Sequence, residues 1–237
     1  ACDAACGPVG AMDKEGVLRF AQEHKVDFVF VAPDDPLAAG MVDYLEGAGL
    51  PCFGPNAKAA EIESSKVFSK SLMKKYGIPT AAYEVFTEQG PALEYIKRQG
   101  KYPVVIKADG LALGKGVVFA QNEREAEDAL RSMMEDKVFG DSGSRVVVEE
   151  FLTGPEATVL AFTDGETLYP MASSMDHKQA YDGDKGPNTG GMGSVCPNRA
   201  YTDELAKRCM EEIFLPTMHA MNQEGRRFKG CLYFGLM

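Results

Sequence analysis

The sequence predicts an α/β segment followed by an α+β region. In the first 79 residues, helical patterns alternate with short apolar runs, which is typical of a parallel sheet covered by helices. In residues 102–120, two β-branched runs flank a glycine-rich loop, which is typical of an antiparallel hairpin. From residue 146 onward, further apolar runs alternate with turn residues and polar loops.

Composition limits the classes of function. The chain has 237 residues, enough for one or two domains of roughly 100–200 residues each. Hydrophobic residues make up 45% of it, so a sizeable core can form. The net charge of −10 argues against general binding to nucleic acid or to anionic membranes. Any bound anion must therefore be held by local lysines and backbone amides.

The cellular compartment is predicted from the lack of an apolar membrane span, from the expected lack of a secretory signal, and from the arrangement of the cysteines. No apolar run approaches the roughly 18 residues of a membrane span, and we expect no secretory signal. The six cysteines form no CxxC pair, and with three histidines a zinc site is not expected. Scattered thiols fit a reducing cytoplasm. The chain does not begin with Met, so we expect its true start to lie upstream.

The first segment reads as helix, strand, helix, strand. Apolar spacing predicts a helix over residues 13–25, and residues 26–32 form a continuous apolar strand. A second helix is expected over residues 37–48, and a short strand and turn over 52–55. The loop at residues 33–37 follows the first strand, where parallel sheets place ligands, although it also fits a plain turn.

Residues 56–76 are expected to form a pair of helical stretches. Their lysines 66, 70, 74 and 75 recur at helical spacing; most should lie on a solvated face, and one could point at a phosphate. A break at residues 77–80 marks a plausible domain boundary. The remaining elements expected before residue 150 are a strand at 85–86, a helix at 90–99, the hairpin, and a helix at 123–134.

The hairpin loop has the chemistry of a polyphosphate site. Its glycines allow backbone N–H groups to approach an anion closely, and Lys107 and Lys115 add positive charge. A P-loop is excluded, because Gly110 and Gly114 are separated by three residues instead of four and Gly116 follows Lys115. The loop also leads into a strand instead of a helix. By itself, the stretch is equally compatible with an ordinary glycine-rich hairpin carrying solvated lysines.

A second candidate site begins at residues 146–152, where a strand runs into Glu149 and Glu150 and then into Phe151 and Leu152. A nucleotide base needs an apolar slot beside backbone polar groups, and carboxylates can accept ribose hydroxyls or hold metal. A charged strand edge with no such role is the alternative. Strands are expected next at residues 157–162 and 167–171, joined by a turn.

Two polar loops follow, at residues 175–178 and 186–193. The second packs four glycines into eight residues, which suits close backbone contact with a small polar or phosphorylated substrate. His177 fits a structural role as well as a functional one. A long amphipathic helix interrupted at Pro216 is expected over residues 202–223, and a strand over 230–237.

Together these stretches resemble the phosphoribosylamine–glycine ligase (glycinamide ribonucleotide synthetase) family of the ATP-grasp superfamily. The resemblance runs in family order from about residue 13 to the end. The GPNTGGMG loop beside Asp176-His177-Lys178 is highly specific within the superfamily. The other matching residues are 32–37, 53–55, 65–66, 106–112, 114–117, 149–152 and 232–237.

The resemblance implies an ATP-grasp fold preceded by the remainder of a parallel α/β amino-terminal domain. It divides the chain into a partial α/β domain with a helical linker (1–79), a lid subdomain (80–152) and a partial core subdomain (153–237). The implied reaction joins glycine to 5-phosphoribosylamine, using ATP and Mg (or Mn), through a glycyl phosphate. Glycine and 5-phosphoribosylamine are thus the expected partners, with no nucleic acid and no membrane.

The resemblance also implies roles for individual residues. Lys66, Lys107 and Lys115 would serve the ATP phosphates, and Gly114 and Gly116 would shape the flap over them. The adenine would be lined by Glu149, Phe151 and Leu152, and Glu156 would approach the ribose. The acceptor substrates would face Asp176, His177, Lys178, Asn188, Thr189, Gly190, Gly191 and Gly193.

Three departures from the family pattern matter. The amino-terminal strand with its GGREH loop is absent, and so is the later EFNxRFGDPE segment whose Glu and Asn ligate magnesium. Asp34 stands where many members have Glu, and Ala32 where many have Gly. We therefore expect an internal fragment with no metal ligands of its own, inactive by itself. Glycine-dependent ADP formation by the isolated chain would contradict this expectation.

Two other functions stay open at this point. The chain could belong to another ATP-grasp carboxylate–amine ligase, such as one that handles formate or bicarbonate. It could also be a non-catalytic nucleotide-binding module, which the missing metal segment would favour.

The flap assignment gives the first prediction. Lys115→Ala in the full-length protein should weaken MgATP binding and preserve the fold, because it removes one cation from the phosphates without touching the core. Equilibrium titration with MgATP measures the change, and circular dichroism checks the fold. Unchanged nucleotide affinity would contradict the assignment.

Overall fold

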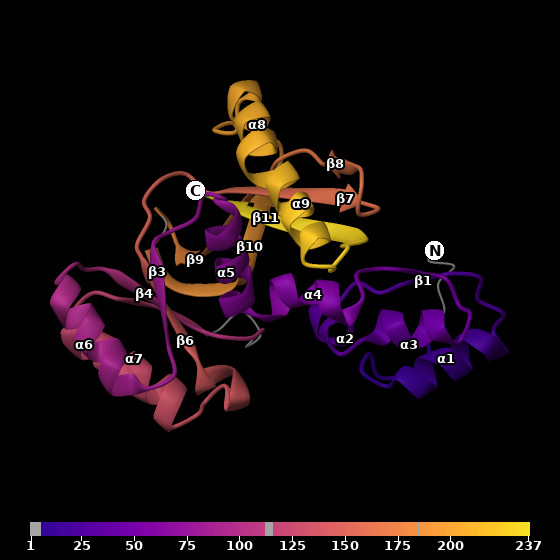
Figure 1. Ribbon diagram of the computed structural model, residues 1–237, viewed down its shortest axis with the longest axis horizontal. Coiled ribbons are helices and arrows are strands. Elements are labelled where there is room, and N and C mark those ends of the chain that lie inside the picture. Colours follow the sequence, from indigo (N-terminus) through magenta and orange to yellow (C-terminus); the bar gives the residue numbers. More distant parts are fainter. Residues whose placement is uncertain (1–5, 112–115, 184) are drawn as a thin grey trace.

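The structure, a computed structural model, describes residues 6–111, 116–183 and 185–237. It is elongated, with the amino-terminal segment at one end, a four-stranded sheet at the other, and the carboxyl-terminal elements over the centre (Figure 1). Each part has its own hydrophobic cluster. Among the described residues, no helix combines the length and apolar character needed to cross a membrane.

The amino-terminal segment contains a short parallel strand pair. Val29 pairs with Cys52 and Phe30 with Phe53, which confirms the predicted parallel arrangement. Helices pack against this pair around a small core that includes Met41 and the fully buried Leu45. The elements are α1 Lys14–Glu23, β1 Val29–Phe30, α2 Asp34–Ala38, α3 Met41–Gly47, β2 Cys52–Phe53 and α4 Ala57–Ser64.

Two predictions for this segment were wrong in detail. The strand expected over residues 26–32 is only two residues long, and Phe28 and Phe30 are more than half exposed. The helix expected over 37–48 is two helices, α2 and α3, because Gly40 has a φ of 83° between them. Glycine adopts this left-handed conformation without steric cost and so ends α2. Apolar periodicity alone does not reveal such a break.

The lid region is an antiparallel sheet with strand order β3-β6-β4-β5. Helices α6 and α7 pack on it through a core centred on Ile96, Ile106 and Leu130 (Figure 1). Its elements are β3 Tyr83–Phe86, α6 Gln89–Gln99, β4 Val104–Ala108, β5 Val117–Ala120, α7 Glu123–Leu130, the π-helical turn η2 Arg131–Glu135, the 3-10 turn η3 Gly140–Ser144 and β6 Val146–Glu150.

The pleat of this sheet separates its two faces. Ile106 and Val148 belong to the apolar core with the helices. Because alternate residues point to opposite faces of a strand, Lys107 and Glu149 project from the other face. The register of β4 with β6 pairs Val105 with Glu149 and Lys107 with Val147, which brings both charged residues to neighbouring positions. The predicted antiparallel hairpin of β4 and β5 is confirmed by their pairing.

The carboxyl-terminal sheet has the order β11-β7-β8 and is also antiparallel. It shares a core with helices α5 and α9, in which the rings of Phe214 and Phe234 lie 4.1 Å apart. The elements are α5 Lys66–Tyr76, β7 Ala157–Thr163, β8 Leu168–Pro170, α8 Asp203–Cys209, the π-helical turn η4 Met210–Phe214, α9 Leu215–Gln223 and β11 Gly230–Leu236.

The long helix near the carboxyl terminus is not interrupted where the sequence predicted. It runs through η4 into α9, with Pro216 in the first turn of α9. Proline has no backbone N–H to donate, and the wider hydrogen-bonding pattern of the preceding π turn accommodates it without ending the helix.

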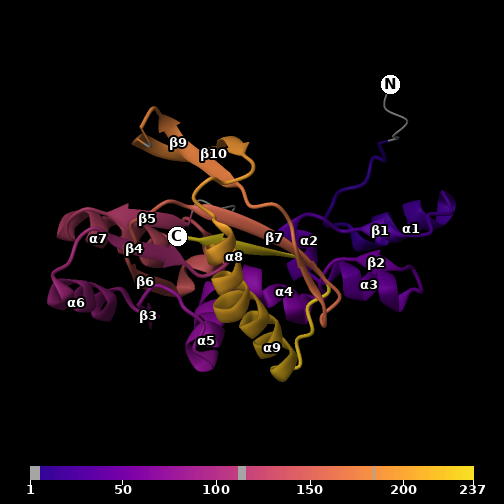
Figure 2. The same cartoon turned by 90° about the horizontal axis from the view of Figure 1, so that it is seen from above.

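The two stretches expected as loops are strands. Residues 175–178 lie in β9 Met175–Tyr181, and residues 186–193 lie in β10 Lys185–Val195; the two strands pair with register shifts. Backbone hydrogen bonds form a ladder whatever the side chains are, so polar and glycine-rich sequences can pair when a turn brings them together. In Figure 2 this hairpin stands apart from the two larger sheets.

A close backbone contact in the lid gives a stability prediction. A Cβ at Gly143 would lie 2.0 Å from the carbonyl oxygen of Met133. Gly143→Ala should therefore destabilise the protein by roughly 1–3 kcal/mol, because the backbone must move. Gly90→Ala in α6 is the matched control: a Cβ there meets no atom within 4 Å, and we expect a change below about 1 kcal/mol. Urea unfolding measures both, and equal stabilities of the two variants would contradict the contact.

Candidate functional site

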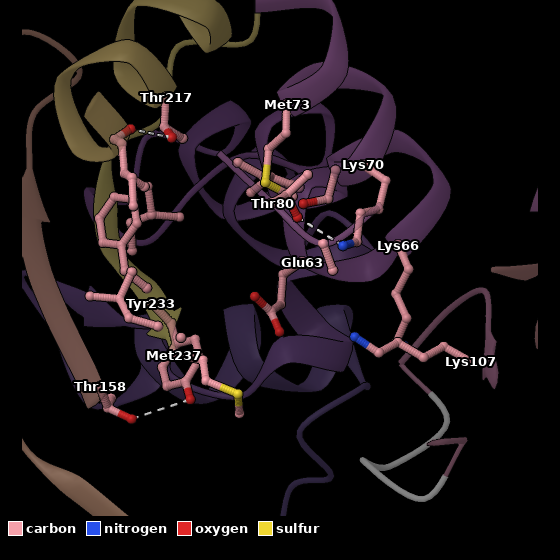
Figure 3. A pocket seen from close by; sticks show the side chains of 18 of the residues that line it. Glu63, Lys66, Lys70, Met73, Thr80, Lys107, Thr158, Thr217, Tyr233 and Met237 are labelled. Carbon is pink, nitrogen blue, oxygen red and sulfur yellow. Dashed lines mark hydrogen bonds between the residues drawn. The ribbon is translucent and has the colours of Figure 1, made fainter. Parts of the chain in front are cut away.

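A cavity of about 940 Å³ lies where the amino-terminal segment, the lid sheet and the carboxyl-terminal sheet meet. Its volume falls in the range of small-molecule sites. In Figure 3, Lys66, Lys70 and Lys107 lie on one side of the cavity, Thr158, Tyr233 and Met237 lie on the other, and Glu63 lies between them.

One wall is built around the buried carboxylate of Glu149. Its Oε2 atom accepts from Lys107 Nζ at 2.9 Å and pairs with Lys70 Nζ at 3.1 Å. Lys70 also donates to Thr80 Oγ1 at 2.8 Å. Lys107 reaches this wall from β4 and Glu149 from β6, and Lys70 reaches it from α5.

Burial shapes the electrostatics of these lysines. Desolvation lowers the pKa of Lys66, and the nearby charge of Lys107 lowers it further, while Asp109, Glu63 and Glu149 oppose the shift. Desolvation also lowers the pKa of Lys70, and Glu149 opposes that shift. Three ammonium groups are thus concentrated on this wall beside the buried Glu149 carboxylate, and such a local concentration of positive charge favours a polyanionic ligand.

A second buried carboxylate, Asp109, fixes the geometry beside this wall. Its Oδ1 accepts from Ser65 Oγ and from the backbone N–H of Val67, both at 3.1 Å. It also forms an ion pair with Arg145, and its own N–H donates to the Arg145 carbonyl at 3.0 Å. Lys66 donates to the carbonyl of Gly110. These contacts tie the first turn of α5 to the end of β4.

The cavity lining also carries carboxylates. Asp34 and Asp35 of α2 and Glu63 of α4 line the cavity. Desolvation raises the pKa of Glu63 and repulsion from Asp34 adds to the shift, while Lys66 opposes it. Glu63 keeps much of its solvent exposure because the cavity is open, so this carboxylate lies inside the site and remains hydrated. The segment at residues 33–37, expected as a loop or a plain turn, instead runs into helix α2, and its Pro33, Asp34 and Asp35 line the cavity.

The residues predicted around a base are only partly brought together. Glu149, Leu152 and Glu156 line the cavity. Phe151 does not line it; its side chain is 40% exposed and its ring meets that of Phe119 edge-on, with centroids 5.8 Å apart. This aromatic pair lies beside the strands that carry the lysine wall.

The residues predicted to face acceptor substrates lie on the β9–β10 hairpin. Lys178 is the member that lines the cavity, and its ammonium lies 3.9 Å from the Asp176 carboxylate. Its carbonyl accepts from Thr189 Oγ1 at 2.8 Å, which links the two strands. The other members whose side chains are described stand on the hairpin outside the cavity lining: Asp176, His177, Thr189, Gly190, Gly191 and Gly193. The backbone of Asn188 pairs with that of Gln179 on the same hairpin.

The flap is described only at its base. The carbonyl of Gly116 accepts from the N–H of Ala108 at 2.8 Å. Gly114 and Lys115 lie outside the described residues. Within the described part of the chain, no three His, Cys, Asp or Glu side chains are grouped closely enough to hold a metal ion.

Several lining residues were missed by sequence reasoning. Lys70 was one of four lysines at helical spacing, and its four-residue distance from Lys66 places both on the same side of α5. Glu63 precedes Lys66 by three residues in the neighbouring helix, which was a weaker signal. Thr80, Thr158 and Tyr233 carry no local signal, because tertiary packing alone brings them to the cavity.

Comparison with known families accounts for the whole chain. Residues 64–237 match the ATP-grasp (A) domain of phosphoribosylglycinamide synthetase, and residues 1–63 match its N domain. The chain is 50% identical over 229 residues to the phosphoribosylamine–glycine ligase of Escherichia coli O6:H1, covering 97% of this chain and 53% of that protein. The chain thus spans about half the length of the curated relatives it matches.

Solved structures agree with the fold. The phosphoribosylamine–glycine ligase of Thermotoga maritima superposes with a TM-score of 0.68 at 37% identity, over 78% of this chain and 47% of that one. The biotin carboxylase domain of Hydrogenobacter thermophilus 2-oxoglutarate carboxylase, in complex with MgADP, ADP and bicarbonate, gives 0.73 at 17% identity, over 97% and 49%. The latter likeness shows the fold alone, and both neighbours support the predicted ATP-grasp class.

The contacts of Asp109 give a prediction about local order. Asp109→Ala should destabilise the protein by about 2–4 kcal/mol, because Ser65, the Val67 amide and Arg145 lose a buried acceptor. Hydrogen exchange should show faster exchange of the Val67 amide. Asp128→Ala is the control, since Asp128 forms an exposed pair with Arg131 worth less than about 1 kcal/mol. Equal effects of the two changes on unfolding would contradict the role given to Asp109.

Proposed function

The chain belongs to the phosphoribosylglycinamide synthetase family, and from that premise we propose that it forms the ATP-binding part of a ligase that joins glycine to 5-phosphoribosylamine. The observation that carries the proposal is the wall of three lysines around Glu149 at a cavity large enough for a nucleotide. Half-buried and buried ammonium groups gathered on one wall attract a polyphosphate. The identity of about 50% to named ligases supports the particular substrates.

The proposed reaction has two steps. A carboxylate oxygen of glycine attacks the γ-phosphorus of ATP, the bond to the bridging oxygen breaks, and ADP leaves with glycyl phosphate formed. The amine of 5-phosphoribosylamine then attacks the acyl carbon, phosphate leaves with the C–O bond, and the nitrogen loses a proton. Both steps depend mainly on positioning and on neutralising phosphate charge.

In this scheme, Lys66 and Lys107 neutralise the phosphates. Glu149 and Leu152 form the side of the cavity that takes the base, and Glu156 accepts a ribose hydroxyl. Their common place in the cavity lining supports these roles. Phe151, Gly114, Lys115 and Gly116 are assigned to the same nucleotide through the family resemblance, the glycines and Lys115 as the flap.

The hairpin of β9 and β10 is assigned to the acceptor substrates. Lys178 in the cavity lining supports this assignment, because its cation is placed where a carboxylate or phosphate could be neutralised. Asp176 lies beside Lys178 and would accept from an amine. His177, Thr189 and the glycines at 190, 191 and 193 would reach the same substrates through this hairpin, together with Asn188.

The reaction is expected to use magnesium, as MgADP in the biotin carboxylase relative also indicates for that protein. The described residues do not offer a cluster of His, Cys, Asp and Glu that fits such an ion. The five cysteines among the described residues are free thiols, which supports our placing of the enzyme in a reducing cytoplasm.

The test is ADP release by the full-length product of this gene with MgATP, omitting glycine and 5-phosphoribosylamine in turn. Sustained release over many turnovers is expected only when both are present, because glycine is needed to form ADP and the glycyl phosphate must be consumed by 5-phosphoribosylamine before the next turnover. Formate and bicarbonate in place of glycine are the controls for other ATP-grasp ligases. Nucleotide binding without release under any of these conditions would overturn the ligase and leave a nucleotide-binding module.

A further inference from the structure

The lysine wall contains an arrangement that phosphate binding alone does not explain. Two ammonium groups, those of Lys70 and Lys107, share one oxygen of Glu149, at 3.1 and 2.9 Å. The other carboxylate oxygen, Oε1, is buried and has no hydrogen-bond partner among the described residues. Glu149 therefore concentrates both of its cationic contacts on one atom.

The two lysines differ in their freedom to move. The side chain of Lys70 is 9% exposed, and its ammonium is also held by Thr80 Oγ1 at 2.8 Å. The side chain of Lys107 is 28% exposed and lines the cavity, and Glu149 is its one recorded polar partner among the described residues. A ligand in the cavity can thus draw Lys107 away more easily than Lys70.

If Lys107 left Glu149 to contact a ligand, the carboxylate would lose a counter-ion in a buried position, because its side chain is only 5% exposed. A buried carboxylate that loses its only counter-ion carries a large free-energy cost, which would oppose binding of the ligand. Lys70 removes this cost, since it stays on Glu149 when Lys107 leaves. Lys66 does not take this role in the structure: within the described residues its recorded hydrogen bond goes to the carbonyl of Gly110, and the ion pairs of Glu149 are with Lys70 and Lys107.

We propose that Lys70 is a positioning residue that retains the buried Glu149 carboxylate and thereby frees Lys107 to bind an anionic group of the nucleotide. The inference rests on the proposed function. It gives Lys70 no direct contact with ATP; the effect passes through the charge of Glu149. Removing Lys70 should therefore weaken ATP binding only while Glu149 is charged.

A double-mutant cycle tests this coupling. The dissociation constant of ATP is measured by calorimetry for the wild-type protein, Lys70→Met, Glu149→Gln and the double variant. Lys70→Met should raise the constant roughly tenfold or more, because Lys107 is then held by Glu149. In the Glu149→Gln background the same change should have an effect below about twofold. If Glu149 itself touches the base, Glu149→Gln weakens ATP binding in both the single and the double variant, so the effect of Lys70→Met within each background can still be compared.

Lys74→Met is the matched control. Lys74 lies one turn further along α5, and its ammonium is 5.6 Å from the Tyr83 ring centroid, the same distance as that of Lys70. No ion pair of Lys74 is recorded within the described ranges, and its side chain is exposed. Lys74→Met should leave ATP affinity unchanged. A loss of affinity equal to that of Lys70→Met would mean that any removed positive charge on this helix weakens ATP binding, and it would overturn the inference.

The remaining outcomes are also decisive. If Lys70→Met lowers ATP affinity equally in the wild-type and the Glu149→Gln backgrounds, the inference is overturned, but the proposal that the cavity binds ATP still stands. No ATP binding by the wild-type protein would overturn the proposed function and the inference with it. If Lys70→Met does not fold, a crystal structure of the wild-type protein with ATP decides: Lys70 must remain within hydrogen-bonding distance of Glu149 while Lys107 contacts the nucleotide, and the reverse arrangement overturns the proposal.

Discussion

The contacts of the buried Asp109 carboxylate are the constraint on which the site depends. Asp109 follows the end of β4 by one residue, and it accepts from Ser65 and from the first turn of α5. Lys66 starts that helix and Lys107 belongs to that strand, so one side chain fixes the spacing of two cations from different parts of the fold. The ion pair with Arg145 adds the beginning of β6 to the same junction.

The pleat of the β3-β6-β4-β5 sheet determines which side chains each of its faces carries. One face buries Ile106 and Val148 under two helices, and the other presents Lys107 and Glu149. Because neighbouring residues must point to opposite sides, the apolar core and the charged wall are built from the same two strands. A register shift of one residue in β4 would exchange them and would bury charge without a partner.

The chain has a net charge of −10, yet the cavity can attract the proposed polyphosphate ligand because of its local distribution of charge. Positive charge is concentrated on one wall, and burial limits its screening by water. Asp34, Asp35 and Glu63 also line the cavity, so it presents carboxylates as well as ammonium groups. A ligand with an anionic end and a hydroxyl- or amine-bearing end matches both kinds of group, which is consistent with a nucleotide or a phosphorylated sugar amine.

The sequence alone determined most of the helices and strands, the antiparallel hairpin, the parallel start and the family, because apolar periodicity and local residue patterns are properties of neighbouring positions. It also singled out Lys66, Lys107 and Glu149. Tertiary structure decided which candidates meet: it joined Lys70 to Glu149 and added Thr80 and Glu63 to the cavity. It also showed that the two polar stretches at residues 175–178 and 186–193, expected as loops, pair as a hairpin. Such contacts depend on backbone register and on packing between segments far apart in the chain, which no local pattern encodes.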